Sequence, residues 1–457
     1  MQRAQDAPFG AHVPAVGATA GTAAQAGRSE SLADESPLQP SATARRTATA
    51  PASERLYTDS ERRGPGREPW QPVPNEQVQQ VCGLDPVLLA QADRTLGKAW
   101  AVIRYGKLCH SYLATDMAPM ESLSATKFLG ATVTGAVALR TADLPRTGPK
   151  TGPLSDEDRV DAWIDRVGYN PEAHIAHVLA MVAQSPDLSY GRRTMEYDYF
   201  GFVQLDSLNF ILNAALRQPG ARLGRNLDEF SKRFVFEPLG MVDSTWSLGL
   251  SNKSFGFGWS TTVLDMARLG LMVLDRGSWD GTQIISAEWA YRMTHPALED
   301  ANTAMGYCTW LNSKANFHTG TMPTPESWTD LTAEPRFPGP CAPAAVYRQH
   351  PHGLSAAPDC NYAPDHDCDQ MFDVGVWQTI AGFGSVIQGH PGLDMVLVAF
   401  QLTPDDFFGM GAAGILWDAV RPAVVAADPQ FASDEAAFCE AYGANRYAPD
   451  LREATTP

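Results

Sequence analysis

Segments with the apolar patterns of β-strands lie towards both ends of this 457-residue chain, and helical periods predominate between them. Residues 99–105 and 108–113 read as two neighbouring strands, and residues 377–388 and 395–402 predict two more. Between residue 156 and about 216, apolar residues recur with helical spacing. This order predicts an α/β fold: an antiparallel sheet completed by both ends of the chain and flanked by helices, with an inserted all-α subdomain.

Composition separates a folded region from two tails. Residues 1–72 are rich in Ala, Ser, Thr, Pro and Gly and carry almost no large apolar side chains, which predicts a disordered N-terminal tail. We expect a folded domain over 73–445, with its helical subdomain at about 145–290, and a C-terminal tail over 446–457. Residues 313–375 are rich in Pro, His and Asp and show little periodicity, so they are expected to form a loop insert.

Charge and apolar run length narrow the range of partners. The net charge of -17, without clusters of Lys and Arg, argues against a nucleic-acid partner. No run of 18 or more apolar residues is present, so we expect no insertion into a membrane. The first six residues lack the charged start and apolar core of a secretory signal peptide.

The seven cysteines nevertheless favour an oxidising compartment, secreted or periplasmic, over the cytosolic alternative in which all are reduced. Cys341, Cys360 and Cys368 lie in the loop insert, which we expect them to staple, and Cys82 and Cys439 lie near the two ends of the folded region. The odd count leaves one thiol free or paired between chains, and the spacing does not fix the connectivity.

A serine and a lysine stand three residues apart at Ser124 and Lys127, just before the small, apolar run 128–138. Residues at i and i+3 share a helix face, so a helix here would bring the amine to the hydroxyl. A serine hydroxyl becomes a good nucleophile when a neighbouring base takes its proton, and a partly buried lysine is one such base. Because the following run is too apolar to lie exposed, the pattern predicts a buried helix with a reactive N-terminus.

Metal ligation is not expected. The acidic stretch 365–369 does not fit a calcium loop, because Gln370 replaces the glycine and Val376 the terminal glutamate. His350, His352 and Cys360 lack the regular spacing of a zinc site. A solvated loop closed by disulfides is the expected structure there, and no cofactor is implied.

Several motifs together resemble one family. Residues 121–127 (Glu-Ser-Leu-Ser-Ala-Thr-Lys) resemble the first motif of class C β-lactamases and the related serine esterases and peptidases. Residues 381–385 resemble the active-site edge strand of that family. The resemblance covers about 74–402 without the loop insert, and it implies a β-lactamase/transpeptidase-like fold. Its central signature is matched by the stretches 239–245, 259–270, 279–289 and 305–310.

The second motif of the family is usually Tyr-x-Asn, and here it falls on Tyr197 and Tyr199. The resemblance implies that Tyr197 relays a proton to the leaving group, although a tyrosine in the core or cleft is the alternative. Tyr199 stands where the substrate-orienting Asn is expected. Whether Lys127 or Tyr197 is the general base is left open, because coupled groups titrate as a pair.

The third motif, Lys-Thr-Gly or His-x-Gly in relatives, falls on residues 380–382, where only Gly382 is kept. This glycine would let the Phe383 N–H join the Ser124 N–H in an oxyanion hole, although a bulge in an edge strand is the alternative. The missing cation would otherwise recognise a substrate carboxylate. Its absence favours an ester or an uncharged amide over a penicillin. Candidate substrate contacts are Tyr199, Tyr307 and Trp310.

The sequence therefore predicts a serine hydrolase that cleaves a small-molecule ester or amide through an acyl-serine intermediate, with esterase-like character and no cofactor. The alternative is a non-catalytic β-lactamase-like binding or scaffold protein, which the changes at Tyr199 and at residues 380–381 would suit. The identity of the substrate and the oligomeric state are not determined by the sequence.

Overall fold

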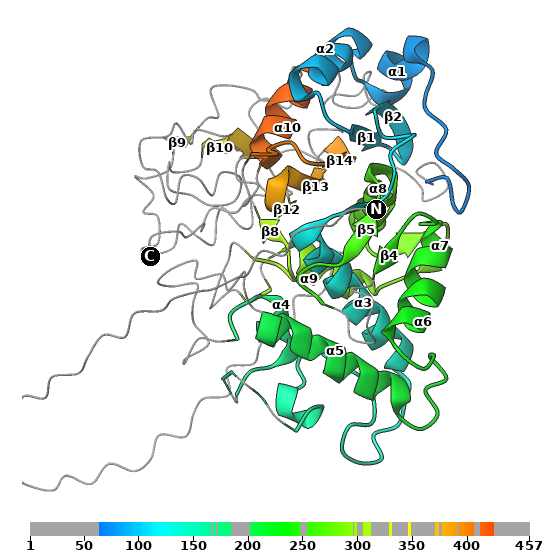
Figure 1. Ribbon diagram of the computed structural model, residues 1–457, viewed down its shortest axis with the longest axis vertical. Coiled ribbons are helices and arrows are strands. Elements are labelled where there is room, and N and C mark those ends of the chain that lie inside the picture. Colours follow the sequence, from blue (N-terminus) through cyan, green and yellow to red (C-terminus); the bar gives the residue numbers. More distant parts are fainter. Residues whose placement is uncertain are drawn as a thin grey trace, which may run out of the picture. The chain divides into compact units, whose positions relative to one another are not determined.

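A six-stranded sheet, with the strand order β2-β1-β14-β13-β12-β8, forms the centre of the fold. Its neighbouring strands are all antiparallel. β14 lies between β1 and β13, so strands from the two ends of the domain pair in the middle of the sheet (Figure 1). The predicted antiparallel sheet is thereby confirmed. Its strands are β1 (Trp100–Arg104), β2 (Lys107–Tyr112), β8 (Trp310–Leu311), β12 (Trp377–Ala381), β13 (Ser385–His390) and β14 (Met395–Ala399).

Side chains alternate between two apolar layers, one on each face of the sheet. Trp100 and Val102 pack with α1 (Asn75–Cys82), α2 (Pro86–Leu96) and α10 (Ala412–Val420), which Figure 1 shows grouped together. Ala101 and Ile103 belong to the other layer, which contains α3 (Thr126–Thr141) and α8 (Val263–Leu274). This alternation is the period of a strand buried on both faces. Helices therefore flank the sheet on both faces, which confirms the predicted antiparallel sheet flanked by helices.

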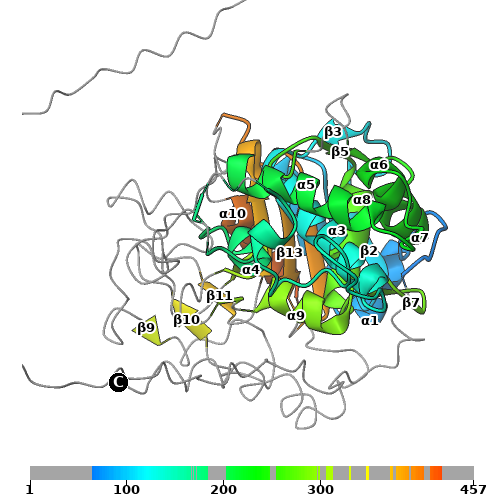
Figure 2. The ribbon, with the colours of Figure 1, turned by 90° about the horizontal axis from the view of Figure 1, so that it is seen from below.

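The region between α3 and α8 is mainly helical, and Figure 2 shows α3, α5 and α8 gathered beside the sheet. It also contains a small sheet with the strand order β3-β5-β4. The strand β3 ends at Glu121, two residues before the start of the turn that contains Ser124. These elements are α4 (Ile175–Leu179), α5 (Phe202–Arg217), α6 (Leu227–Ser231), η4 (Lys232–Phe236), α7 (Glu237–Leu239), β3 (Met120–Glu121), β4 (Thr245–Trp246) and β5 (Trp259–Thr261).

The remaining elements are short. β6 (Ser278–Trp279) and β7 (Thr282–Gln283) form a hairpin before α9 (Ala287–Thr294). The insert 313–375, expected to be a loop, contains a small sheet of β9 (Thr329–Asp330), β10 (Val346–Arg348) and β11 (Met371–Asp373). Single turns occur at η1 (Leu123–Ala125), η2 (Val160–Ala162), η7 (Gly382–Gly384) and η9 (Arg421–Ala423).

Most of the chain between residues 64 and 424 is described by the computed structural model. The C-terminal tail expected at 446–457 lies outside the described residues, and so do Cys341, Cys360, Cys368 and Cys439. Cys82 and Cys109 form a disulfide between α1 and β2. The described residues are 64–165, 167, 169–170, 172–183, 202–246, 254–295, 297–298, 305–311, 329–330, 346–348, 371–373, 377–390, 393–405 and 412–424.

Two boundaries differ from those that the sequence predicts. Residues 64–72, assigned by composition to the tail, pack on the domain: Trp70 is 6% exposed and its indole N–H donates to the Leu264 carbonyl at 3.3 Å. The single strand predicted over 377–388 is two strands, β12 and β13, joined by η7. The reason is the left-handed backbone of Phe383, with φ at 59°, which turns the chain back on itself.

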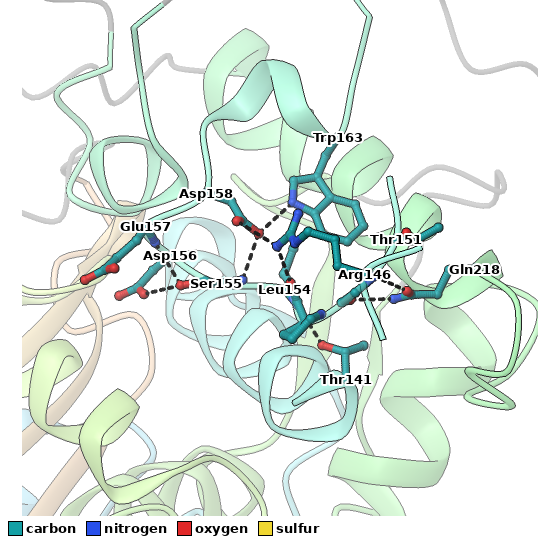
Figure 3. Close-up of polar contacts among 12 residues, drawn as sticks. Thr141, Arg146, Thr151, Leu154, Ser155, Asp156, Glu157, Asp158, Trp163 and Gln218 are labelled. Atoms are coloured by element: carbon teal, nitrogen blue, oxygen red, sulfur yellow. Dashed lines mark hydrogen bonds and ion pairs between the residues drawn. The ribbon is translucent and has the colours of Figure 1, made fainter. Parts of the chain in front are cut away.

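The turn-rich segment 145–154, which follows α3, is fixed by a side chain at the end of α3 and by another just after α5 (Figure 3). The Thr141 hydroxyl at the end of α3 accepts a hydrogen bond from the Leu154 N–H at 2.9 Å. The Gln218 side chain accepts from the Gly152 N–H at 2.6 Å and donates to the Gly152 carbonyl at 3.0 Å. The chain therefore leaves α3 along a defined path, which holds the helical region against the helix that follows Ser124.

Candidate active site

Ser124 lies in the turn η1, immediately before the buried helix α3. The Lys127 amine donates a hydrogen bond to the Ser124 hydroxyl, with 2.7 Å between Nζ and Oγ. Lys127 is 4% exposed, whereas Ser124 is half-buried. The helix brings the two heads together as the three-residue spacing predicts. The Ser124 hydroxyl is thus open to solvent on one side and contacts a desolvated amine on the other. An activated serine nucleophile needs this arrangement.

The turn of Ser124 is held against β5 by backbone and side-chain bonds. The Ser122 N–H donates to the Trp259 carbonyl at 2.8 Å, and the Trp259 N–H donates to the Thr126 hydroxyl at 3.1 Å. Leu123, between these ties, has a left-handed backbone with φ at 49°. Residues other than glycine rarely adopt this backbone conformation, and it persists where surrounding contacts impose it.

Two carboxylates hold the segment 254–258 beside this turn. Glu121 accepts from the Gly258 N–H at 2.8 Å, and Asp206 of α5 accepts from the Phe255 N–H at 2.8 Å. Burial raises the pKa of Asp206, while its backbone bond to Phe255 and the charge of Lys127 oppose that rise. Burial likewise raises the pKa of Glu121 against its backbone bonds. Asp206 lies outside every motif quoted above, and Glu121 stands at the first position of the 121–127 motif without an assigned role. Their bonds to Phe255 and Gly258 join residues far apart in the sequence.

Cys308 is a buried free thiol within the electrostatic range of Lys127. Its Sγ donates to the Leu179 carbonyl at 3.4 Å. Burial raises the pKa of the Cys308 thiol to about 12, although the charge of Lys127 acts in the opposite direction. Because the thiolate is the nucleophilic form, Cys308 is not a competing nucleophile at neutral pH.

The turn η7, which contains Gly382 and Phe383, follows β12; the sequence predicts these residues, together with Ser124, for the oxyanion hole. η1 lies against β12 and β13, so the turn of Ser124 adjoins the hairpin that η7 closes. Gly382 and Phe383 are both half-buried. The Phe383 carbonyl accepts from the Thr403 N–H at 3.1 Å, which fixes the turn from its outer side. These contacts place the hairpin beside the candidate nucleophile.

The other predicted site residues have different positions. Tyr197 and Tyr199 lie outside the described residues. Trp310 is half-buried in β8 and pairs with Gln378 of β12. Tyr307 has no exposed surface, and its hydroxyl donates to Asp156 in a buried network. The Tyr307 side chain is therefore part of the interior of the domain and is not accessible to a substrate.

Within the described residues, no group of three or more His, Cys, Asp or Glu side chains is arranged to hold a metal ion. The acidic stretch 365–369 lies outside those residues. The same part of the chain contains no helix that is both long enough and apolar enough to cross a membrane. The expected lack of a metal and of a cofactor stays a prediction.

No protein-family model and no curated protein matches the chain. Solved structures similar to it include a β-lactamase from Mycobacterium bovis, at 18% identity over 73% of this chain and 97% of that chain, with a TM-score of 0.42. A penicillin-binding protein from Bacillus halodurans is similar at 12% identity over 72% of this chain and 98% of that chain, with a TM-score of 0.39. A family VIII carboxylesterase is similar at 12% identity over 74% and 97%, with a TM-score of 0.42.

Proposed function

We propose that the chain is a serine hydrolase that cleaves a small-molecule ester or uncharged amide through an acyl-serine intermediate. The observation that carries the proposal is the 2.7 Å contact between Lys127 Nζ and Ser124 Oγ at the start of a buried helix. A nucleophile within hydrogen-bond reach of a base is the geometric signature of covalent catalysis. The motif resemblance that extends from the Ser124 turn to the β12 hairpin supports it.

In the proposed reaction, Ser124 Oγ attacks the substrate carbonyl carbon and its proton passes to Lys127 or Tyr197. The carbonyl oxygen becomes an oxyanion, which the N–H groups of Ser124 and Phe383 stabilise. As the bond to the leaving group breaks, Tyr197 returns the proton to the departing alcohol or amine. Water then attacks the acyl carbon, which releases the carboxylic acid and restores the Ser124 hydroxyl.

The chemistry around the nucleophile favours an esterase over a penicillinase. Residues 380–381 are Ile and Ala, where relatives that bind a substrate carboxylate carry a cation or its partner. A substrate carboxylate at that position would lose its counter-charge, and an unpaired buried charge is costly. Neutral acyl groups do not incur this cost, so short esters and uncharged amides are the proposed substrates.

The test is covalent labelling with a fluorophosphonate, followed by intact mass and by turnover of p-nitrophenyl esters. The parent should gain one adduct that peptide mapping places on Ser124, and Ser124→Ala should lose the adduct and at least about 10³-fold of turnover. Ser111→Ala, a half-buried serine on the outer strand β2, is the matched control and should behave as the parent. A chromogenic cephalosporin should be hydrolysed far more slowly than the esters. If no acylating probe labels the parent, the binding or scaffold function is favoured instead.

A further inference from the structure

We propose that Glu121 is a positioning residue, which acts through Leu123 to hold the Ser124 hydroxyl at the Lys127 amine. The inference rests on the proposed function, because it concerns the same nucleophile. It adds a residue to the site that takes no part in the proton transfers. The argument depends on which backbone groups the carboxylate binds and on what those groups would do without it.

A single oxygen of Glu121 accepts two backbone hydrogen bonds from segments far apart in the chain. Oε1 accepts from the Leu123 N–H at 2.9 Å and from the Gly258 N–H at 2.8 Å. The first bond closes the turn just before Ser124, and the second fastens this turn to the buried residue that precedes β5. Charge-assisted bonds from a carboxylate to backbone N–H groups are among the stronger hydrogen bonds in proteins.

The Leu123 bond matters because the backbone of this residue is in a conformation that leucine rarely adopts. Its φ of 49° lies in the left-handed region, which is unfavourable for residues other than glycine. The neighbouring ties hold Ser122 and Thr126 to Trp259, and neither of them involves Leu123 itself. The Leu123 carbonyl also accepts from the Thr126 N–H, which holds the peptide unit that follows Leu123. The bond from the Leu123 N–H to Glu121 holds the peptide unit that precedes it, so its loss would weaken the hold on the left-handed φ of Leu123.

Relaxation of Leu123 would rotate the next peptide unit and displace Ser124. The Ser124 hydroxyl and the Lys127 amine are only 2.7 Å apart, and a shift of about 1 Å is enough to impair a reacting geometry. Glu121 would therefore control how reactive Ser124 is without contact with the substrate. The geometry predicts that loss of its acceptor oxygen matters more than loss of its charge.

The test uses a thiol as a reporter at position 124, so that it can be read without any substrate. In Ser124→Cys, the pH dependence of iodoacetamide alkylation, followed by peptide mapping, gives the apparent pKa of the introduced thiol. Contact with Lys127 should hold this pKa below the value of about 8.5 that is usual for a free cysteine. Adding Glu121→Ala should raise it towards 8.5 and slow alkylation at pH 7 by about 3- to 10-fold.

Matched variants separate geometry from charge and from general destabilisation. Glu121→Gln keeps an acceptor oxygen and should leave the profile close to that of Ser124→Cys alone. Leu123→Gly, added to Glu121→Ala, should restore most of the lost reactivity, because glycine adopts positive φ without strain. Asp85→Ala removes a carboxylate oxygen that also accepts two backbone N–H groups, at the start of α2, and should change nothing at position 124.

The inference is overturned if Glu121→Ala leaves the alkylation profile unchanged, or if Leu123→Gly fails to restore it. If Glu121→Ala does not fold, Glu121→Asp takes its place, since its carboxylate is one methylene too short to bridge the two amides. Failure of the proposed function would show separately, as a parent protein that no acylating probe labels. The thiol profile can still be measured in that case.

Discussion

The buried Asp156 forms an ion pair with the half-buried Arg292, with 2.5 Å between Asp156 Oδ2 and Arg292 Nη1. The same carboxylate oxygen accepts a hydrogen bond from the Tyr307 hydroxyl. Burial and the negative charge of Asp156 raise the pKa of Tyr307 well above its usual range, so the phenol stays protonated and donates. This network joins the segment after α3, drawn in Figure 3, to α9 and to the segment that begins β8.

We expect Arg292→Leu to destabilise the fold strongly. The substitution leaves the Asp156 carboxylate, which is 10% exposed, without its cation, and breaking one side of a buried pair costs about 3–5 kcal/mol. Urea unfolding followed by tryptophan fluorescence measures the loss. Arg225→Leu is the control, because Arg225 is 91% exposed in its pair with Glu229 and should contribute no more than about 1 kcal/mol. Equal losses in the two variants would contradict the assigned role.

Asp265 gives the fold a defined pH dependence. It is 4% exposed at the start of α8 and accepts from the Ser244 hydroxyl at 2.8 Å. Burial raises its pKa to about 6. Because the pKa of Asp265 is higher in the folded state than in the unfolded state, folding between these two pKa values is accompanied by uptake of a proton at Asp265. This stabilisation is complete below about pH 4 and is lost as the pH rises through about 6.

Asp265→Asn should remove this dependence, since the amide oxygen can still accept from Ser244 but carries no charge. Relative to the variant, the parent should lose about 3 kcal/mol of unfolding free energy between pH 4 and pH 7, as a shift of about two pKa units implies. Chemical unfolding at several pH values measures the difference. The exposed residue Asp143 supplies the control Asp143→Asn, for which a much smaller change is expected. Parallel stability curves for parent and Asp265→Asn would refute the prediction.

Local spacing is what made the contact between Ser124 and Lys127 predictable. Ser124 and Lys127 are three residues apart, so one helical turn brings their heads together whatever the rest of the fold does. The cap of α8 is local in the same way: the Thr262 hydroxyl accepts from the N–H of Asp265, three residues further on, at 3.2 Å.

Contacts between distant segments could not be predicted from the sequence. Glu121 and Gly258 are 137 residues apart, and Tyr307 and Asp156 are 151 apart, so no periodicity relates either pair. The turn at Phe383 was missed for a different reason. The apolar pattern runs on through it, and whether a Gly-Phe-Gly segment continues a strand or reverses it depends on backbone angles that the pattern does not encode.

Arg268 should fix the N-terminal segment 64–70 to the domain. Its guanidinium is buried and donates to the Gly66 and Leu239 carbonyls, each at 2.7 Å, and to the Glu68 carbonyl. Arg268→Met would remove the donor to the Leu239 carbonyl and leave the Gly66 carbonyl with the Trp279 indole N–H, at a cost of about 1–3 kcal/mol. Limited proteolysis should then cut within 64–70 several-fold faster. Arg268→Lys keeps one cationic donor group and should give an intermediate rate. Unchanged cleavage in Arg268→Met would show that other contacts hold the segment.

Lys127 should control the reactivity of Ser124 and not merely fill the space beneath it. Lys127→Met keeps a long apolar side chain in a position that is 4% exposed, but it removes the amine that reaches Ser124 Oγ. Fluorophosphonate labelling of Ser124 should therefore slow by about 10²- to 10⁴-fold, the usual range for loss of an acid–base group. Lys107→Met, at an exposed position on β2, is the matched control and should label at the rate of the parent. Melting temperatures recorded for both variants separate loss of reactivity from loss of fold. Labelling of folded Lys127→Met at the parent rate would remove Lys127 from the mechanism and leave Tyr197 as the general base.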